Sequence, residues 1–267
     1  MRSAAIGLGC LMAMCAPAAA AQVPLQTPFE TPLPWSLPQG GWEAAAGVSF
    51  SSGEHPPFFA EEPATERDRW ALDLVDLSRG LGAGCEARLQ FGAQHVEEED
   101  GEPLWGIQDA RLSFAYQIPG AIAAALTMEV KLPNAGDEDR LGTDQTDVTM
   151  AASGGHQADR WGWAARAGLG LLGNPLQAAA QDDVLVFGVA AWRRMAPGPP
   201  QRGWLVTGEV YGMAASRFGN DFRYARAGVL LGAAFPVSVT LSRGLTSESG
   251  DWGVDLSVTL LHSNLPR

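Results

Sequence analysis

The chain has 267 residues, of which 46% are apolar and 32 are glycine, a length that suits one large domain or two small ones. Its formal net charge is −12 and lysine occurs once, at Lys131, so it lacks the basic surplus with which proteins neutralise nucleic acid phosphates. Beyond the N-terminus, no segment approaches the roughly 18 consecutive apolar residues of a membrane-spanning helix, which excludes a helical membrane protein.

The first 21 residues have the pattern of a secretory signal peptide. Arg2 supplies the charged start, residues 6–14 form a short apolar run, and the alanines at 19–21 offer a cleavage site. Removal of residues 1–21 takes away two of the three cysteines and leaves Cys85, so the exported chain has no internal disulfide. Its stability must then come from packing or from a closed hydrogen-bonded sheet.

Residues 22–40 form a proline-rich lead that cannot donate a regular ladder of backbone hydrogen bonds. It also contains the large apolar residues Leu33, Trp35 and Leu37. Two interpretations are open: a disordered periplasmic tail, which is the simpler one and is favoured, or a plug that folds into the interior of the protein.

From residue 41 onward, apolar and polar side chains alternate in segments of about ten residues, as in a two-faced β-strand. In the first segment Trp42, Val48 and Phe50 share one face, whereas Glu43 and Ser49 share the other. The segments with clear alternation are 42–50, 85–93, 109–116, 122–131, 163–171 and 252–260. Weaker candidates are 69–78, 146–153, 184–193, 204–212, 223–232 and 237–243, which brings the total to about twelve strands. The one helical signal, a turn or two, lies at 176–182.

The connections between these segments alternate between long and short. Long loops are expected near 52–68, 94–105 and 133–145, and short turns near 79–83 and 118–120. These long loops carry 14 of the 30 acidic residues, and later connections follow the alternation less cleanly, because the one at 195–203 is not short. Outer-membrane barrels have short periplasmic turns and longer outward loops. A soluble β-sandwich also produces strand alternation, but it does not require this pattern of connections.

Tryptophan is placed near the ends of the predicted strands. Seven of the nine tryptophans are of this kind: Trp42, Trp70, Trp161, Trp163, Trp192, Trp204 and Trp252. Aromatic girdles at the two membrane interfaces need this distribution, because an indole there combines an apolar ring with a hydrated N–H group. We therefore favour an all-β fold, a transmembrane antiparallel β-barrel of about twelve strands over residues 41–262 with a short tail at 263–267.

The polar faces of the strands carry both signs of charge, so we expect charged side chains in the lumen. The candidates that line it are Glu86, Arg88, Asp109, Arg111, Glu129, Lys131, Asp147, Arg166, Glu209, Arg226 and Asp255. The favoured interpretation is that neighbours such as Glu86/Arg88, Asp109/Arg111 and Glu129/Lys131 neutralise one another and fill the barrel. The alternative is a charged constriction that selects a solute.

Several short motifs occur in an order that resembles one family. The motifs are Gly-Ile-Gln-Asp at 106–109, Lys-Leu-Pro at 131–133, Leu-Gly-Thr at 141–143, Ser-Arg-Gly-Leu at 242–245 and Asp-Trp-Gly-Val-Asp at 251–255. This order resembles the outer-membrane transporters named after the meta-cleavage pathway of phenol degradation. The resemblance implies a bacterial outer-membrane barrel that takes up hydrophobic or aromatic compounds. The chain departs from outer-membrane barrels in general by ending on Arg267 without a terminal aromatic residue for the assembly machinery to recognise.

Other chemistry finds little support. The glycine spacing at 168–173 matches a dinucleotide-binding motif but lies within a predicted strand, where no helix N-terminus can hold a pyrophosphate. The four histidines lack the spacing of metal ligands, and no Gly-x-Ser-x-Gly element occurs. We expect no enzyme activity, no cofactor and no metal site.

The sequence therefore predicts an outer-membrane channel or transporter for small solutes, hydrophobic or aromatic ones included. The alternative is a non-conducting barrel with a filled lumen that presents its acidic loops to partners. The expected partners are outer-membrane lipid, lipopolysaccharide and the barrel assembly machinery, but not nucleic acid.

Overall fold

The computed structural model describes residues 29–54, 66–98, 101–120, 122–135, 141–142, 145–173, 181–195, 203–215, 221–232, 235–247 and 249–262. The predicted signal peptide and the tail at 263–267 lie outside these residues. Within them, no helix is long and apolar enough to span a membrane.

The described chain forms antiparallel strands. In order they are β1 (Trp42–Glu54), β2 (Arg67–Gly82), β3 (Cys85–Glu98), β4 (Leu104–Ile107), β5 (Ala110–Ile118), β6 (Ala123–Leu132), β7 (Asp147–Gln157), β8 (Trp161–Gly173), β9 (Gln181–Arg194), β10 (Trp204–Ala215), β11 (Arg223–Leu231), β12 (Val237–Gly244) and β13 (Trp252–His262).

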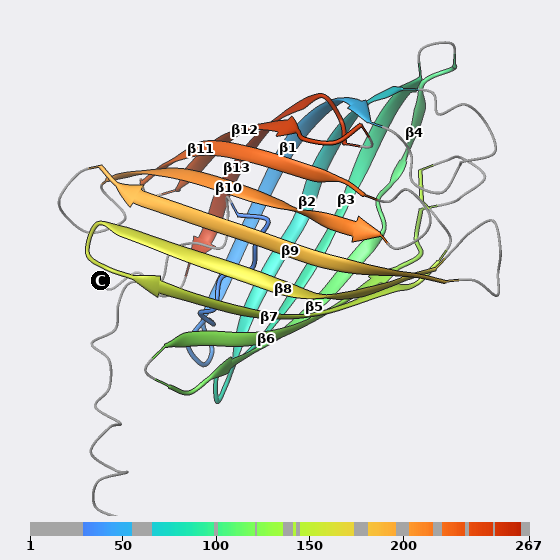
Figure 1. The fold of residues 1–267 in the computed structure, drawn as a ribbon. Helices are drawn as coiled ribbons and strands as arrows, with labels where there is room; N and C mark the ends of the chain where they lie inside the picture. Colours follow the sequence, from blue (N-terminus) through green and yellow to red (C-terminus); the bar gives the residue numbers. More distant parts are fainter. Residues whose placement is uncertain are drawn as a thin grey trace, which may run out of the picture.

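The sheet closes on itself, because β1 pairs with β2 on one side and with β13 on the other, and β2 also pairs with β3. β4 and β5 pair with successive parts of β3, so they act as one strand interrupted at Gln108 and Asp109. The result is a closed 12-strand antiparallel barrel (Figure 1). It confirms the all-β barrel predicted from alternation and connection lengths.

The two ends of the barrel differ in their connections. At one end, called the turn end, short segments such as 83–84 and 158–160 join the strands, with the longer 195–203 as the exception. At the other, called the loop end, longer segments such as 55–66 and 133–146 join them. The strands reach further than expected into the loop predicted at 94–105, since β3 ends at Glu98 and β4 begins at Leu104. The helical turn predicted at 176–182 falls mostly outside the described residues, and β9 begins at residue 181.

Side chains alternate between the two faces of the wall as the sequence predicts. On β8, Leu169 is 65% exposed on the outer face, whereas Ala164 on the inner face is fully buried. The outer face of the barrel is therefore apolar, and the inner face carries small and polar side chains. This distribution suits a wall with lipid outside and a lumen inside.

Outward-facing tryptophans gather at both ends of the barrel. At the loop end, the ring of Phe50 lies 4.7 Å from that of Trp70 and 5.1 Å from that of Trp252, and Trp105 stacks on His95 at 4.1 Å. At the turn end, the exposed tryptophans include Trp161, Trp163 and Trp204. The girdle prediction is wrong for Trp192, which is 5% exposed and faces the lumen because Gly162 on the neighbouring strand leaves room for its indole.

Candidate functional site: the occupied lumen

The described part of the lead, residues 29–40, lies inside the barrel (Figure 1, blue). Phe29 and Leu33 are 6% and 4% exposed and pack with Ala164, Ala190 and Trp192 of the inner wall. The ring of Trp192 lies 5.4 Å from that of Phe29 and 5.9 Å from that of Trp35. The tail interpretation, favoured from the sequence, is therefore wrong for residues 29–40, because the lead buries its apolar side chains against an apolar part of the lumen.

Glycines on the inner wall make the space that the lead occupies. A Cβ atom on Gly188 of β9 would collide with Thr31, and one on Gly80 of β2 would collide with the backbone carbonyls of residues 37 and 38. A Cβ atom on Gly155 of β7 would lie 3.0 Å from Cγ of Pro34. Side chains at these positions would close the groove along which the lead runs.

Polar side chains of the wall bind the backbone N–H groups of the lead. The Glu209 carboxylate accepts hydrogen bonds from the N–H groups of Glu30, at 3.1 Å, and Thr31. Glu86 Oε2 accepts one from the N–H of Leu37 at 2.7 Å. Further along, Gln117 Oε1 accepts bonds from both the N–H and the hydroxyl of Ser36. The wall thus supplies acceptors that the proline-rich lead cannot find within itself.

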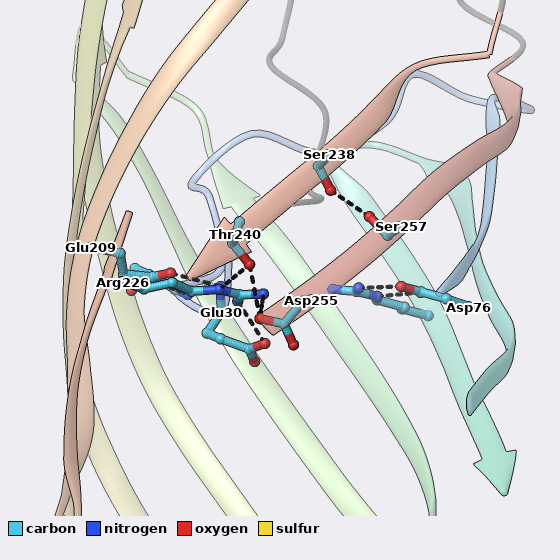
Figure 2. A network of polar contacts seen from close by, with 10 residues as sticks. Glu30, Asp76, Glu209, Arg226, Ser238, Thr240, Asp255 and Ser257 are labelled. Atoms are coloured by element: carbon cyan, nitrogen blue, oxygen red, sulfur yellow. Dashed lines mark hydrogen bonds and ion pairs between the residues drawn. The ribbon is translucent and has the colours of Figure 1, made fainter. Parts of the chain in front are cut away.

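Arg226 on β11 ties the lead to the wall (Figure 2). Its guanidinium pairs with Glu30 at 2.9 Å and with Asp255 at 2.8 Å, and its Nε donates to the Thr240 hydroxyl at 2.8 Å. The Thr240 hydroxyl donates in turn to Asp255 at 2.8 Å. With the Arg226 side chain only 8% exposed, this network satisfies a charge that would be costly to bury alone.

Two opposing effects act on the pKa of the Glu30 carboxylate. Burial acts to raise its pKa, but the attraction of Arg226, together with Arg111 and Arg88 further away, holds the pKa below its usual value. Glu30 therefore carries its charge while the lead is in place.

Charges elsewhere in the lumen pair across strands. Arg88 binds Asp76 through two hydrogen bonds of 2.7 and 2.6 Å, and Lys131 lies 2.6 Å from Asp147 and 3.5 Å from Asp109. The expected within-strand pairing of Glu86/Arg88, Asp109/Arg111 and Glu129/Lys131 is therefore wrong. Residues two apart on one strand are further from each other than residues directly opposite on neighbouring strands, which lie about 5 Å apart.

The eleven lumen candidates do not form one site. Glu209, Arg226 and Asp255 meet around Glu30, and Asp109, Lys131 and Asp147 form a second group near the loop end. Arg111 lies 3.9 Å from Glu129, and Glu86 binds the lead. Arg166 stands apart on β8.

Sequence reasoning missed several partners of these groups. Glu30 lies in a lead without periodicity, so no pattern placed it in the lumen. Asp76 and Thr240 lie in the strands with weaker alternation, 69–78 and 237–243, and alternation on those strands offered the one available signal. Among the described residues, no group of His, Cys, Asp and Glu side chains is arranged to hold a metal. Much of the acidic loop sequence, including residues 61–62 and 137–139, lies outside the described residues.

Comparison with known proteins supports the fold. Neither a protein-family model nor a curated protein matches the sequence. Among solved structures, an outer membrane channel from Pseudomonas putida F1 is similar with a TM-score of 0.59 and 14% identity, over 84% of this chain and 96% of that one. The beta domain of the Bordetella autotransporter BrkA has a TM-score of 0.49 at 13% identity, over 82% of this chain and 98% of that one. The CymD monoaromatic hydrocarbon channel also has a TM-score of 0.49, at 10% identity, over 84% of this chain and 88% of that one.

The likeness to the Pseudomonas putida channel shows an outer-membrane type of barrel fold. The finer resemblance to the phenol-pathway transporters stays a prediction.

Proposed function

We propose that this chain is an outer-membrane channel for small solutes, and that residues 29–40 plug its lumen. The observation that carries the proposal is the construction of the interior: a closed barrel with a polar inner face, occupied by a segment that is not part of the wall. Glu30 joins the lead to Arg226, and Glu209 and Glu86 bind its backbone, all through contacts that water can replace. A segment held in this way can leave without breaking the barrel.

The proposal extends to hydrophobic and aromatic solutes. The motif order described above resembles a family assigned to such compounds. In addition, the lumen holds an aromatic cluster formed by Phe29, Trp35 and Trp192. When the lead moves, Trp192 would offer its ring to an apolar solute passing along the inner face of β9.

The location and partners form part of the same proposal. Export through the signal peptide at residues 1–21 would deliver the chain to the assembly machinery, and the apolar outer face with its two tryptophan girdles would then contact outer-membrane lipid and lipopolysaccharide. No catalytic activity and no cofactor are proposed.

One observation favours the alternative function, a non-conducting barrel that acts through its loops. The lead and the paired charges fill much of the lumen, and Arg226 is almost completely enclosed. On this account the lead would be a permanent part of the core, comparable to the packed interior of small barrels.

Single-channel conductance separates the two functions. The protein beginning at Gln22 would be compared in planar bilayers with a variant that lacks residues 27–39, both shown to be folded by their resistance to denaturation in detergent. The channel account predicts ion-conducting steps that are larger or more frequent in the deletion variant. Silence from both folded proteins would contradict it and support the filled barrel.

A further inference from the structure

Arg166 projects into the lumen from the middle of β8. Its direct neighbours across the strands are Ser153 on β7 and Gly188 on β9. Within the described part of the chain, its guanidinium makes no hydrogen bond and no ion pair. The side chain is half-buried, so it is still open to the lumen.

Three other cations of the lumen are bound by carboxylates at short distance, and a fourth, Arg111, lies 3.9 Å from Glu129. Arg88 and Lys131 each lie 2.6 Å from their closest carboxylate, and Arg226 has one at 2.8 Å. A buried charge is costly unless it is paired and hydrogen-bonded. Arg166 is therefore an unusual member of the inner wall, with five N–H donors and no acceptor in contact.

Ser153, which lies directly opposite Arg166 on β7, also lacks a hydrogen-bond partner. Its side chain belongs to a residue that is 6% exposed, and its Oγ atom is buried without a hydrogen-bond partner. Residues in register on neighbouring strands have Cβ atoms about 5 Å apart on the same face. The Ser153 and Arg166 side chains therefore start side by side on the inner face, and neither has a hydrogen-bond acceptor among the described residues.

We propose that Arg166 and Ser153 bind the carboxylate group of a small organic solute as it passes through the lumen. The planar guanidinium matches the two oxygens of a carboxylate, and the hydroxyl supplies a further donor beside it. This inference rests on the proposed channel function and names a class of solute for it, organic anions with a carboxylate.

Carboxylates near Arg166 limit the affinity of the site for anions. The carboxylates of Glu129, Glu30 and Glu209 lie further from Arg166 than an ion pair, yet close enough to attract its charge. They would repel a bound anion and so limit its affinity, to a dissociation constant on the order of 1 mM. Weak binding suits conduction, because a solute must be able to leave the site as readily as it enters.

Saturation-transfer NMR on the folded protein in detergent tests the site directly. The probes are sodium propionate and its neutral counterpart propionamide, titrated against a background of sodium chloride at constant ionic strength. Propionate is expected to bind, and propionamide is expected to bind at least about tenfold more weakly because it lacks the charge. Equal binding of the two probes would overturn the proposal, as would complete competition by chloride at equal concentration.

Substitutions at Arg166 and Ser153 test whether propionate binds at this site. Arg166→Gln is expected to weaken propionate binding about tenfold, and Ser153→Ala about threefold. Arg193→Gln, an outward-facing position on β9, is the matched control and is expected to bind as the unmodified protein does. Unchanged binding in Ser153→Ala and Arg166→Gln would overturn the proposal, and if Arg166→Gln does not fold, Ser153→Ala and the two probes decide.

This measurement does not depend on ion flow. A barrel that is silent in bilayers but binds propionate at Arg166 would refute the channel function and leave the site intact. A conducting barrel without propionate binding would do the opposite.

Discussion

Two arcs of the barrel wall present opposite chemistry to the lead. The inner faces of β8 and β9, here the small-residue arc, offer Ala164, Gly188 and Ala190, and they receive the apolar side chains of the lead. The inner faces of β10 to β13, the polar arc, offer Glu209, Arg226, Thr240 and Asp255, and they bind its charge and its backbone. The position of the lead is thus specified twice, by available space on one arc and by charge on the other.

The largest effect is expected from the polar arc. Arg226→Ala would leave Asp255 and Glu30 without their cation. Because the Asp255 and Glu30 side chains are 32% and 52% exposed, we expect the free energy of unfolding to fall by about 2 kcal/mol, less than for a fully buried pair. Urea unfolding of the barrel in lipid vesicles measures this loss. The matched control on the same strand is Arg223→Ala, whose pair with Asp221 is 44% and 38% exposed and should contribute less than about 0.5 kcal/mol. Equal losses in the two variants would contradict the network.

A smaller effect is expected from the small-residue arc. In Gly188→Val the new side chain would collide with Thr31 and displace the lead without altering any charge. We expect this to lower the free energy of unfolding by about 1–2 kcal/mol. Chymotrypsin should then cleave after Phe29 and Trp35 in the folded protein. Gly208→Val is the control, because a Cβ atom there meets nothing within 4 Å, and its lead should stay protected. If the lead is protected from cleavage in both variants, its position in the lumen does not depend on the space beside Gly188.

The smallest effect is expected from pH. Since the folded pKa of Glu30 is lowered, its pairing contributes fully above the ordinary value of 4.5 and is lost as the pH falls through the lower folded pKa. Release of the lead, followed by the change in tryptophan fluorescence as Trp35 leaves Trp192, should therefore increase only as the pH falls below 4.5, with no change between pH 6 and 8. Glu30→Gln should remove this increase, and an unchanged pH profile in that variant would assign it to another carboxylate.

The architecture was accessible from the sequence because it depends on local alternation. Leu169 and Ala164 lie on opposite faces by their parity on one strand. The same rule predicted that Glu209 faces inward, and in the structure this side chain binds the backbone of the lead. Connection lengths then separated the two ends. Strand alternation reports faces reliably, since it needs no knowledge of which strands are neighbours.

The pairing of charges was not accessible, because it depends on register between strands. Lys131 lies opposite Asp147, which is 16 positions further along the chain, and it does not pair with its within-strand neighbour Glu129, as the sequence suggested. The sequence left the lead open between a tail and a plug for a different reason. Its prolines remove periodicity, and the glycines that receive it, such as Gly188, can be recognised only once the barrel is closed. Trp192 was assigned to the wrong face because the apolar 184–193 segment alternates only weakly.

The most direct test of the central claim is to lock the lead in place. The Cβ atom of Thr31 lies 3.2 Å from a Cβ atom built on Gly188, close to the roughly 3.5–4.5 Å of a disulfide. A Thr31→Cys, Gly188→Cys variant, with Cys85→Ser to remove the remaining thiol, would be recorded in planar bilayers before and after reduction. The account predicts that the oxidised protein is closed and that conducting steps begin on reduction. Identical conductance in both states would show that the lead does not control the lumen.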